Sequence, residues 1–209
     1  MKFCKQFGVL AACMMTAEAM ALQVNVRNSS GEPVESAVVA VYGDLPQRQM
    51  ETAVMDQHDR QFLPQVLAVQ VGTKVTFPNS DDIRHHVYSF SPAKRFELRL
   101  YHGTTAEPVM FDQPGKVVLG CNIHDSMLGY IYVLDTPAFA VTDVNGRAQL
   151  DVPPGRYRLQ VQHPRADQLT EQAVAVGADE PGSVQVEFGR LAPDPRSVGD
   201  KTELEALFD

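Results

Sequence analysis

Apolar and polar residues alternate along most of this 209-residue chain with a period of two. Such alternation is typical of strands that bury one face. The clearest runs are Leu22 to Val26, Phe96 to Leu100, Tyr157 to Val161 and Val184 to Phe188. Turn-forming residues separate them at Ser30-Gly31, Asp112 to Gly115, Asn145-Gly146 and Pro153-Pro154-Gly155. The pattern predicts an all-β protein, most simply two packed β-sandwiches.

Two segments, Val117 to Leu119 and Ile131 to Leu134, are apolar without interruption. Continuous apolar runs of this length predict strands that are buried on both faces. A helical pattern occurs only in the tail, residues 191–209, where Asp200 and Glu203 would form a capping box and Leu204, Leu207 and Phe208 would share one face.

The composition is that of a globular protein, with 44% hydrophobic and 21% charged residues. The formal net charge is −8, which argues against a partner with a phosphate backbone. We therefore expect no nucleic-acid partner.

The first 21 residues have the features of a signal peptide. Lys2 and Lys5 precede an apolar stretch, and Ala19-Met20-Ala21 is an A-x-A cleavage site. We expect cleavage near Ala21 and a periplasmic mature protein without a transmembrane segment, because no other run approaches ~18 apolar residues. Cys13 follows a lipoprotein-like sequence, but the apolar run before it has only about six residues, which disfavours a lipid anchor.

Removal of the leader takes Cys4 and Cys13 and leaves Cys121 as the single thiol of the mature chain. A lone cysteine cannot form an internal disulfide, and in an oxidising compartment it is a liability unless something occupies its sulfur. The usual alternative is a buried and inert thiol.

Three soft or borderline donors, Cys121, His124 and Met127, follow one another at intervals of three residues. Upstream, the sequence Arg84-His85-His86-Val87 supplies further imidazole groups. Two histidines, one cysteine and one weakly bound methionine are the ligands of a type 1 copper site, whose trigonal geometry both copper oxidation states tolerate. A strand ending at Cys121, followed by a tight loop, would bring the downstream donors together.

These motifs, with Val75-Thr76-Phe77-Pro78-Asn79 and Phe96-Glu97-Leu98, resemble the cupredoxins over residues 55 to 135. The chain is most similar to the amicyanin, plastocyanin and pseudoazurin group and to exported plastocyanin-like proteins labelled methylamine-utilisation proteins. The resemblance implies a Greek-key β-sandwich with one type 1 copper ion held by His85, Cys121, His124 and Met127.

The sequence departs from this family at two positions. His86 stands where the family usually has an asparagine directly after the first ligand, and Asp125 stands where amicyanin-type loops tend to have proline. Either His85 or His86 could therefore be the first ligand. Alignment on Val87 favours His85.

Residues 139–159 resemble the second half of a carboxypeptidase-regulatory-like, transthyretin-type β-sandwich, with a hairpin expected at Asn145-Gly146, and Leu22 to Tyr42 resembles its first half. An alternative is that Leu22 to Tyr42 extends the copper domain. The inserted arrangement predicts the following order: signal peptide 1–21, first part of the regulatory-like sandwich 22–48, cupredoxin domain 49–136, second part of the sandwich 137–190 and C-terminal tail 191–209.

Together these features predict a type 1 copper protein for periplasmic electron transfer, with an unidentified redox protein as partner and His124 as the exposed edge. Two alternatives are a copper carrier or buffer and an interaction module with a structural metal. We do not expect an enzyme, because a closed copper centre lacks an open coordination position and no Ser-His-Asp or paired-carboxylate arrangement stands out.

Overall fold

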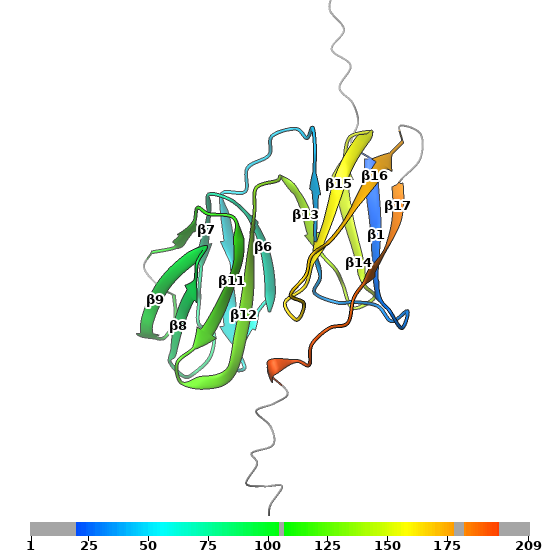
Figure 1. Ribbon diagram of the computed structural model, residues 1–209. Coiled ribbons are helices and arrows are strands. Elements are labelled where there is room, and N and C mark those ends of the chain that lie inside the picture. The colour runs from blue at the N-terminus through cyan, green and yellow to red at the C-terminus, as the bar shows by residue number, and fades with distance from the viewer. Residues whose placement is uncertain (1–19, 105–106, 178–181, 197–209) are drawn as a thin grey trace, which may run out of the picture.

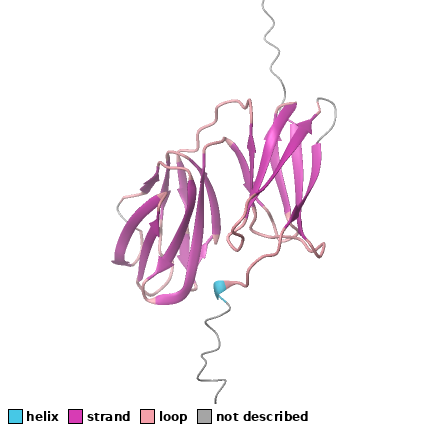
Figure 2. Cartoon of the chain, in the orientation of Figure 1, coloured by secondary structure: helices cyan, strands magenta, loops and turns pink. Residues whose placement is uncertain are grey.

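The computed structural model describes residues 20–104, 107–177 and 182–196. These residues form seventeen β-strands, and their one helical element is a short 3₁₀ turn that begins at residue 195 (Figure 2). The predicted all-β class is confirmed. No helix in these three ranges is long and apolar enough to cross a membrane. Residues 1–19 of the predicted leader and the predicted tail helix fall outside the described residues, whereas Met20 and Ala21 begin strand β1.

The first sandwich is built from residues 52–134 and lies beside the second in Figure 1. Its larger sheet has the order β6 (Val66–Gln70), β12 (His124–Leu134), β11 (Gly115–Cys121), β8 (His85–Ser91) and β9 (Lys94–Tyr101). Its smaller sheet has the order β10 (Val109–Phe111), β7 (Thr73–Thr76) and β3 (Thr52–Val54), and β4 (Asp56–His58) pairs with β5 (Gln61–Leu63). Phe77, Phe111, Leu119 and Ile131 belong to its fully buried core.

The second sandwich also has two sheets. One has the order β14 (Arg147–Val152), β1 (Met20–Asn28) and β17 (Gly182–Phe188). The other has the order β13 (Ala138–Val141), β2 (Val38–Tyr42), β15 (Gly155–Gln162) and β16 (Thr170–Val176). Leu22, Val39, Leu159 and Phe188 lie in its core.

The strands of the second sandwich come from both sides of the first along the chain. β1 pairs antiparallel with β14 and parallel with β17, and β2 pairs with both β13 and β15. Residues 20–42 therefore complete two sheets whose other strands come from residues 138–188. This pairing is the arrangement that an inserted copper domain would give, and the exact boundaries stay a prediction.

Asn145-Gly146 was expected to close a hairpin, and that expectation is wrong. β13 and β14 flank this turn but lie in different sheets, where β13 pairs with β2 and β14 pairs with β1. The chain must cross tightly between the sheets here. Gly146 has a φ of 72°, and a Cβ at this position would collide with the carbonyl oxygen of Val26.

The two sandwiches share an apolar interface. Successive residues of β12 point to opposite faces, so Ile131 and Val133 enter the core of the first sandwich while Tyr130, Tyr132 and Leu134 face the second. The other members of this interface core are Val38 and Ala40 of β2 with Val66 and Ala68 of β6. Burial on both faces is thus confirmed for β12. It is wrong for Val118 of β11, which is 36% exposed.

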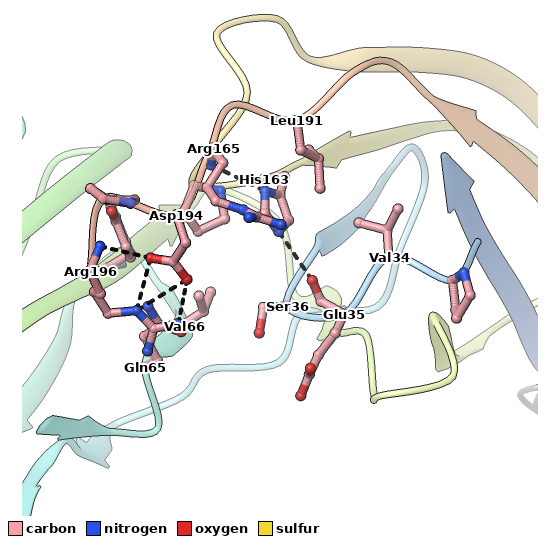
Figure 3. Close-up of a pocket in the computed structure, with 14 residues that line it drawn as sticks. Val34, Glu35, Ser36, Gln65, Val66, His163, Arg165, Leu191, Asp194 and Arg196 are labelled. Atoms are coloured by element: carbon pink, nitrogen blue, oxygen red, sulfur yellow. Dashed lines mark hydrogen bonds and ion pairs between the residues drawn. The ribbon is translucent and has the colours of Figure 1, made fainter. Parts of the chain in front are cut away.

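A groove of about 290 Å³ runs beside this interface (Figure 3). It is lined by both sandwiches and by the segment after β17, in which the Arg196 guanidinium bonds the Asp194 carboxylate at 2.6 Å. His163 lies on its wall. Nε2 of His163 bonds the carbonyl oxygen of Glu35 at 3.1 Å, and Nδ1 accepts the backbone N–H of Arg165 at 3.1 Å. This pattern requires a neutral ring.

Tyr132 offers a test of the interface. Its side chain is 2% exposed, and its hydroxyl has no hydrogen-bond partner among the described residues. A buried hydroxyl without a partner opposes folding, so Tyr132→Phe should raise the free energy of unfolding by about 1 kcal/mol in a urea titration. Tyr157→Phe is the matched control and should lower it by about 1 kcal/mol, because the Tyr157 hydroxyl donates to the Pro153 carbonyl at 2.8 Å. Equal decreases in the free energy of unfolding of both variants would contradict the conclusion that the Tyr132 hydroxyl lacks a hydrogen-bond partner.

His163 predicts a pH dependence of stability. Burial, followed by the charge of Arg165, lowers the pKa of His163 to about 4. The unfolded chain binds this proton below its ordinary pKa of about 6.5, whereas the folded chain binds it only near 4. Stability is therefore fully present above about pH 6.5 and should fall by roughly 2–3 kcal/mol as the pH drops to about 4. Urea unfolding of the wild type and of His163→Gln, measured from about pH 4 to 7.5, isolates this effect as the difference between their free energies of unfolding. If the free energy of unfolding depends on pH in the same way in both proteins, the role of His163 is refuted.

Candidate metal centre

Three of the four predicted ligands meet at one end of the larger sheet of the first sandwich. His85 begins β8, Cys121 ends β11 and His124 begins β12. β8 and β11 pair at Val87 and Cys121, and the N–H of Asn122 donates to the carbonyl oxygen of His86 at 3.1 Å. In Figure 1 this end lies opposite the two segments, 43–51 and 135–137, that connect the sandwiches.

The strand pairing is irregular at the donor positions. The register of β11 against β12 shifts between Gly120 and Cys121, and that of β8 against β9 shifts between His85 and Val87. β-Bulges commonly occur beside functional sites because they re-aim a side chain without ending the strand. Here the shifts fall at Cys121 and His85.

The donor atoms are close enough to share one ion. The Cys121 Sγ atom lies 3.6 Å from Nδ1 of His85 and 3.6 Å from Nδ1 of His124. The two imidazole rings have centroids 5.1 Å apart, and the three donor atoms all lie within 4.8 Å of one another.

These distances fit a bound metal. Metal–nitrogen bonds of about 2.0–2.1 Å and a metal–sulfur bond of about 2.3 Å, meeting at about 110–120°, place nitrogen and sulfur roughly 3.6–3.8 Å apart. The spacing between the Cys121 sulfur and both imidazole nitrogens is 3.6 Å. A single ion can therefore reach all three atoms without a large movement of the chain.

Burial differs among the predicted ligands. His85 is completely buried, Cys121 is 3% exposed and His124 is partly exposed. Met127 is 1% exposed and belongs to the same apolar core as Cys121. The loop residue Asp125 is exposed.

His86, the alternative first ligand, lies elsewhere. Its Nε2 atom bonds the Glu97 carboxylate at 2.9 Å, and its ring packs edge-on against Tyr88. It is absent from the group of donor atoms around Cys121 in the described structure. The geometry therefore favours His85 over its neighbour.

The second nitrogen of His85 bonds Asp81, a residue that the sequence pattern did not single out. His85 Nε2 lies 2.6 Å from the Asp81 carboxylate, which also accepts the backbone N–H groups of Asp59 at 2.6 Å and Arg60 at 3.0 Å. Burial raises the pKa of Asp81, but the hydrogen bonds from His85, Arg60 and Asp59 outweigh it and leave the pKa below its usual value. The weak sequence signal was a carboxylate four residues before a candidate ligand.

Asn79 fixes the loop that carries Asp81. Its buried side chain donates to the carbonyl oxygens of Ile83 and Tyr101, both at 2.9 Å, and accepts the N–H of Asp81 at 3.1 Å. In the sequence Asn79 stood out only as part of a family-like motif. Its bonds to both ends of the neighbouring loop show that it holds the entrance to β8 in place.

The electrostatics keep His124 neutral. Burial, followed by the nearby His85 and the Arg60 cation, lowers the pKa of His124. Its ring nitrogen can therefore act as a donor at neutral pH. The remaining histidines are not among the three donors. His58 is exposed, with its Nδ1 atom 3.9 Å from the Asp81 carboxylate, His102 is exposed, and His163 lines the groove between the sandwiches.

No protein-family model and no curated protein sequence matches this chain. Among solved structures, it is similar to a purple cupredoxin from Nitrosopumilus maritimus (20% identity, TM-score 0.35, 40% of this chain and 99% of the other). It is also similar to a reduced point mutant of amicyanin (20% identity, TM-score 0.36, 46% and 98%). A third similar structure is the copper-containing nitrite reductase from Thermus scotoductus (24% identity, TM-score 0.38, 54% and 28%).

At these identities and TM-scores the similarity does not decide what the chain does. The similar structures include an enzyme, so they leave open whether this protein is one. The case for a metal depends on the donor atoms themselves.

Asn79→Ala tests the bracing of the site. Loss of its side chain leaves the carbonyl groups of Ile83 and Tyr101 without this donor, so the free energy of unfolding of the metal-free protein should fall by about 2–3 kcal/mol in urea. The adjacent Ser80→Ala is the control, because Ser80 is exposed and its hydroxyl bonds Asp56; it should change stability by less than about 0.5 kcal/mol. Similar small losses in both variants would show that Asn79 does not brace the loop.

Proposed function

We propose that this protein is a type 1 copper electron carrier. The observation that supports it most directly is the position of two imidazole Nδ1 atoms, each 3.6 Å from one buried thiol sulfur. The buried thioether-bearing residue Met127 shares the apolar core with that thiol.

The donor types favour copper over other metals. Structural zinc sites generally have four strong ligands rich in cysteine, and calcium and magnesium prefer oxygen. The three donors that lie together are two imidazoles and one thiol, and the proposed fourth is the thioether of Met127, so no carboxylate is among them. A bound copper ion would supply one-electron redox chemistry.

The protein itself has three tasks in this proposal. Cys121 would lose its proton if it bound the ion, because a coordinated thiol is deprotonated. The paired strands β8 and β11 hold the Cys121 sulfur 3.6 Å from Nδ1 of His85 without a metal, so binding would need little movement of the chain. Met127 would supply a weakly bound thioether that tunes the potential.

His124 is the proposed route for the electron. It is the one partly exposed member of the three-donor group, and its neighbour Ile123 is 49% exposed. Leu128 is also partly exposed. An imidazole edge with apolar neighbours suits brief contact with a redox protein partner, which is the partner class we propose.

We propose that the chain acts in the periplasm after removal of its leader. Residues 1–19 lie outside the described structure, and β1 begins at Met20. Cleavage after Ala21 would retain Leu22, Val24 and Val26, which are completely buried in the second sandwich. The cleavage site is therefore compatible with an intact fold.

A copper carrier or buffer is the second candidate, because a partly exposed His124 would also allow transfer of the ion. An enzyme is the less favoured interpretation, since His85, Cys121, His124 and Met127 together would complete the coordination and leave no position for a substrate.

The visible spectrum of the Cu(II)-loaded protein tests the proposal. One equivalent of Cu(II) should produce intense thiolate-to-copper absorption, because the Cys121 thiolate would bind the ion. Cys121→Ser should remove the colour, whereas Met127→Leu should keep it and shift the potential. A protein that binds only Cu(I) and stays colourless would instead be a carrier.

His85→Ala and His86→Ala form the matched pair for ligand assignment. Copper binding should be lost from His85→Ala and retained by His86→Ala, as measured by equilibrium dialysis. The reverse result would make His86 the ligand.

A further inference from the structure

The contact between His85 and Asp81 joins two buried side chains on the side of the imidazole away from Cys121. Nδ1 of His85 lies 3.6 Å from the thiol sulfur, and Nε2 lies 2.6 Å from a carboxylate oxygen of Asp81. The His85 side chain is fully buried and that of Asp81 is 8% exposed. The His85 imidazole therefore lies between the Cys121 sulfur and the Asp81 carboxylate.

The Asp81 carboxylate is itself held in place. Two consecutive backbone N–H groups, of Asp59 and Arg60, donate to its two oxygens. Both residues have positive φ angles, 52° and 58°, which are uncommon for residues other than glycine. The turn between β4 and β5 therefore points two amides at one carboxylate, while Asn79 fixes the backbone of Asp81 from the other side.

This contact determines which nitrogen of His85 carries the proton. A carboxylate accepts hydrogen bonds, so Nε2 of His85 must carry a proton. In the neutral ring, which is the form that binds a metal, Nδ1 then keeps its lone pair. The lone pair then faces the Cys121 sulfur. The hydrogen bond also prevents the ring from turning over.

We propose that Asp81 is a positioning residue of this centre, which selects the metal-binding tautomer of His85 and lowers the midpoint potential. This proposal rests on the proposed copper function. A carboxylate partner makes an imidazole ligand more basic, and a nearby negative charge favours the more highly charged ion. Both effects stabilise Cu(II) more than Cu(I), so the protein with Asp81 should be harder to reduce than one without it.

The test uses three variants of the full chain. Asp81→Asn removes the charge but retains an oxygen that can accept from His85 Nε2, and Asp81→Ala removes both. Asp82→Asn is the matched control, because Asp82 follows Asp81 directly, carries the same charge and is exposed. Circular dichroism establishes that each variant is folded.

Two measurements separate this proposal from the copper proposal. In the metal-free protein, ¹⁵N NMR of the histidine rings should show a single Nε2–H tautomer for His85 in the wild type and in Asp82→Asn, and a mixture of tautomers in Asp81→Ala. In the copper-loaded protein, both Asp81 variants should bind Cu(II) about 10-fold more weakly relative to Cu(I), which raises the midpoint potential by about 59 mV.

A wild type that shows no copper colour would overturn the proposed function, while the tautomer measurement would still report on Asp81. A coloured wild type whose Asp81 variants match Asp82→Asn in tautomer and potential would overturn the role of Asp81 alone. A shift of equal size in Asp82→Asn would also overturn it, because the effect would then be one of general surface charge.

Discussion

The pairing of β8 with β11 is the constraint on which the candidate centre depends. The register that places Val87 opposite Cys121 brings His85 beside a thiol 36 residues away in the sequence. The short turn from β11 into β12 then returns His124 to the same sulfur. Because backbone hydrogen bonds fix both strands, the donor positions belong to the sheet rather than to a mobile loop, which is the condition for a metal site that changes little between oxidation states.

Strand β12, which begins at the candidate metal centre, also forms the contact with the second sandwich. β12 begins at His124 and ends at Leu134, a length of about 33 Å at the usual rise per residue. Its first residues lie at the candidate metal centre and its last residues, Tyr130 to Leu134, are buried between two cores. The second sandwich therefore covers an apolar face that the first would otherwise expose to water.

The sequence was sufficient for the features that depend on local pattern. Period-two alternation predicted the strands, and soft donors at short spacing predicted Cys121 and His124 as neighbours. It was insufficient where the partner lies far along the chain. Asp81 sits in a polar loop that resembles any exposed turn, and its role is visible only once the β4–β5 turn and His85 surround it. The turn at Gly146 was predicted but not its crossing between sheets, because that depends on where β1 and β2 insert.

The first sandwich lies in the sequence between the strands of the second, and this order has a consequence for biosynthesis. β1 and β2 leave the ribosome first, yet the strands they pair with begin at residue 138, so about a hundred residues must follow before either sheet can close. The first sandwich is contiguous and can complete its own sheets during that interval. Since contacts between distant residues form slowly, we expect the first sandwich to close before the second. The nascent chain then carries two apolar strands that must be kept from aggregating until the last third of the protein arrives.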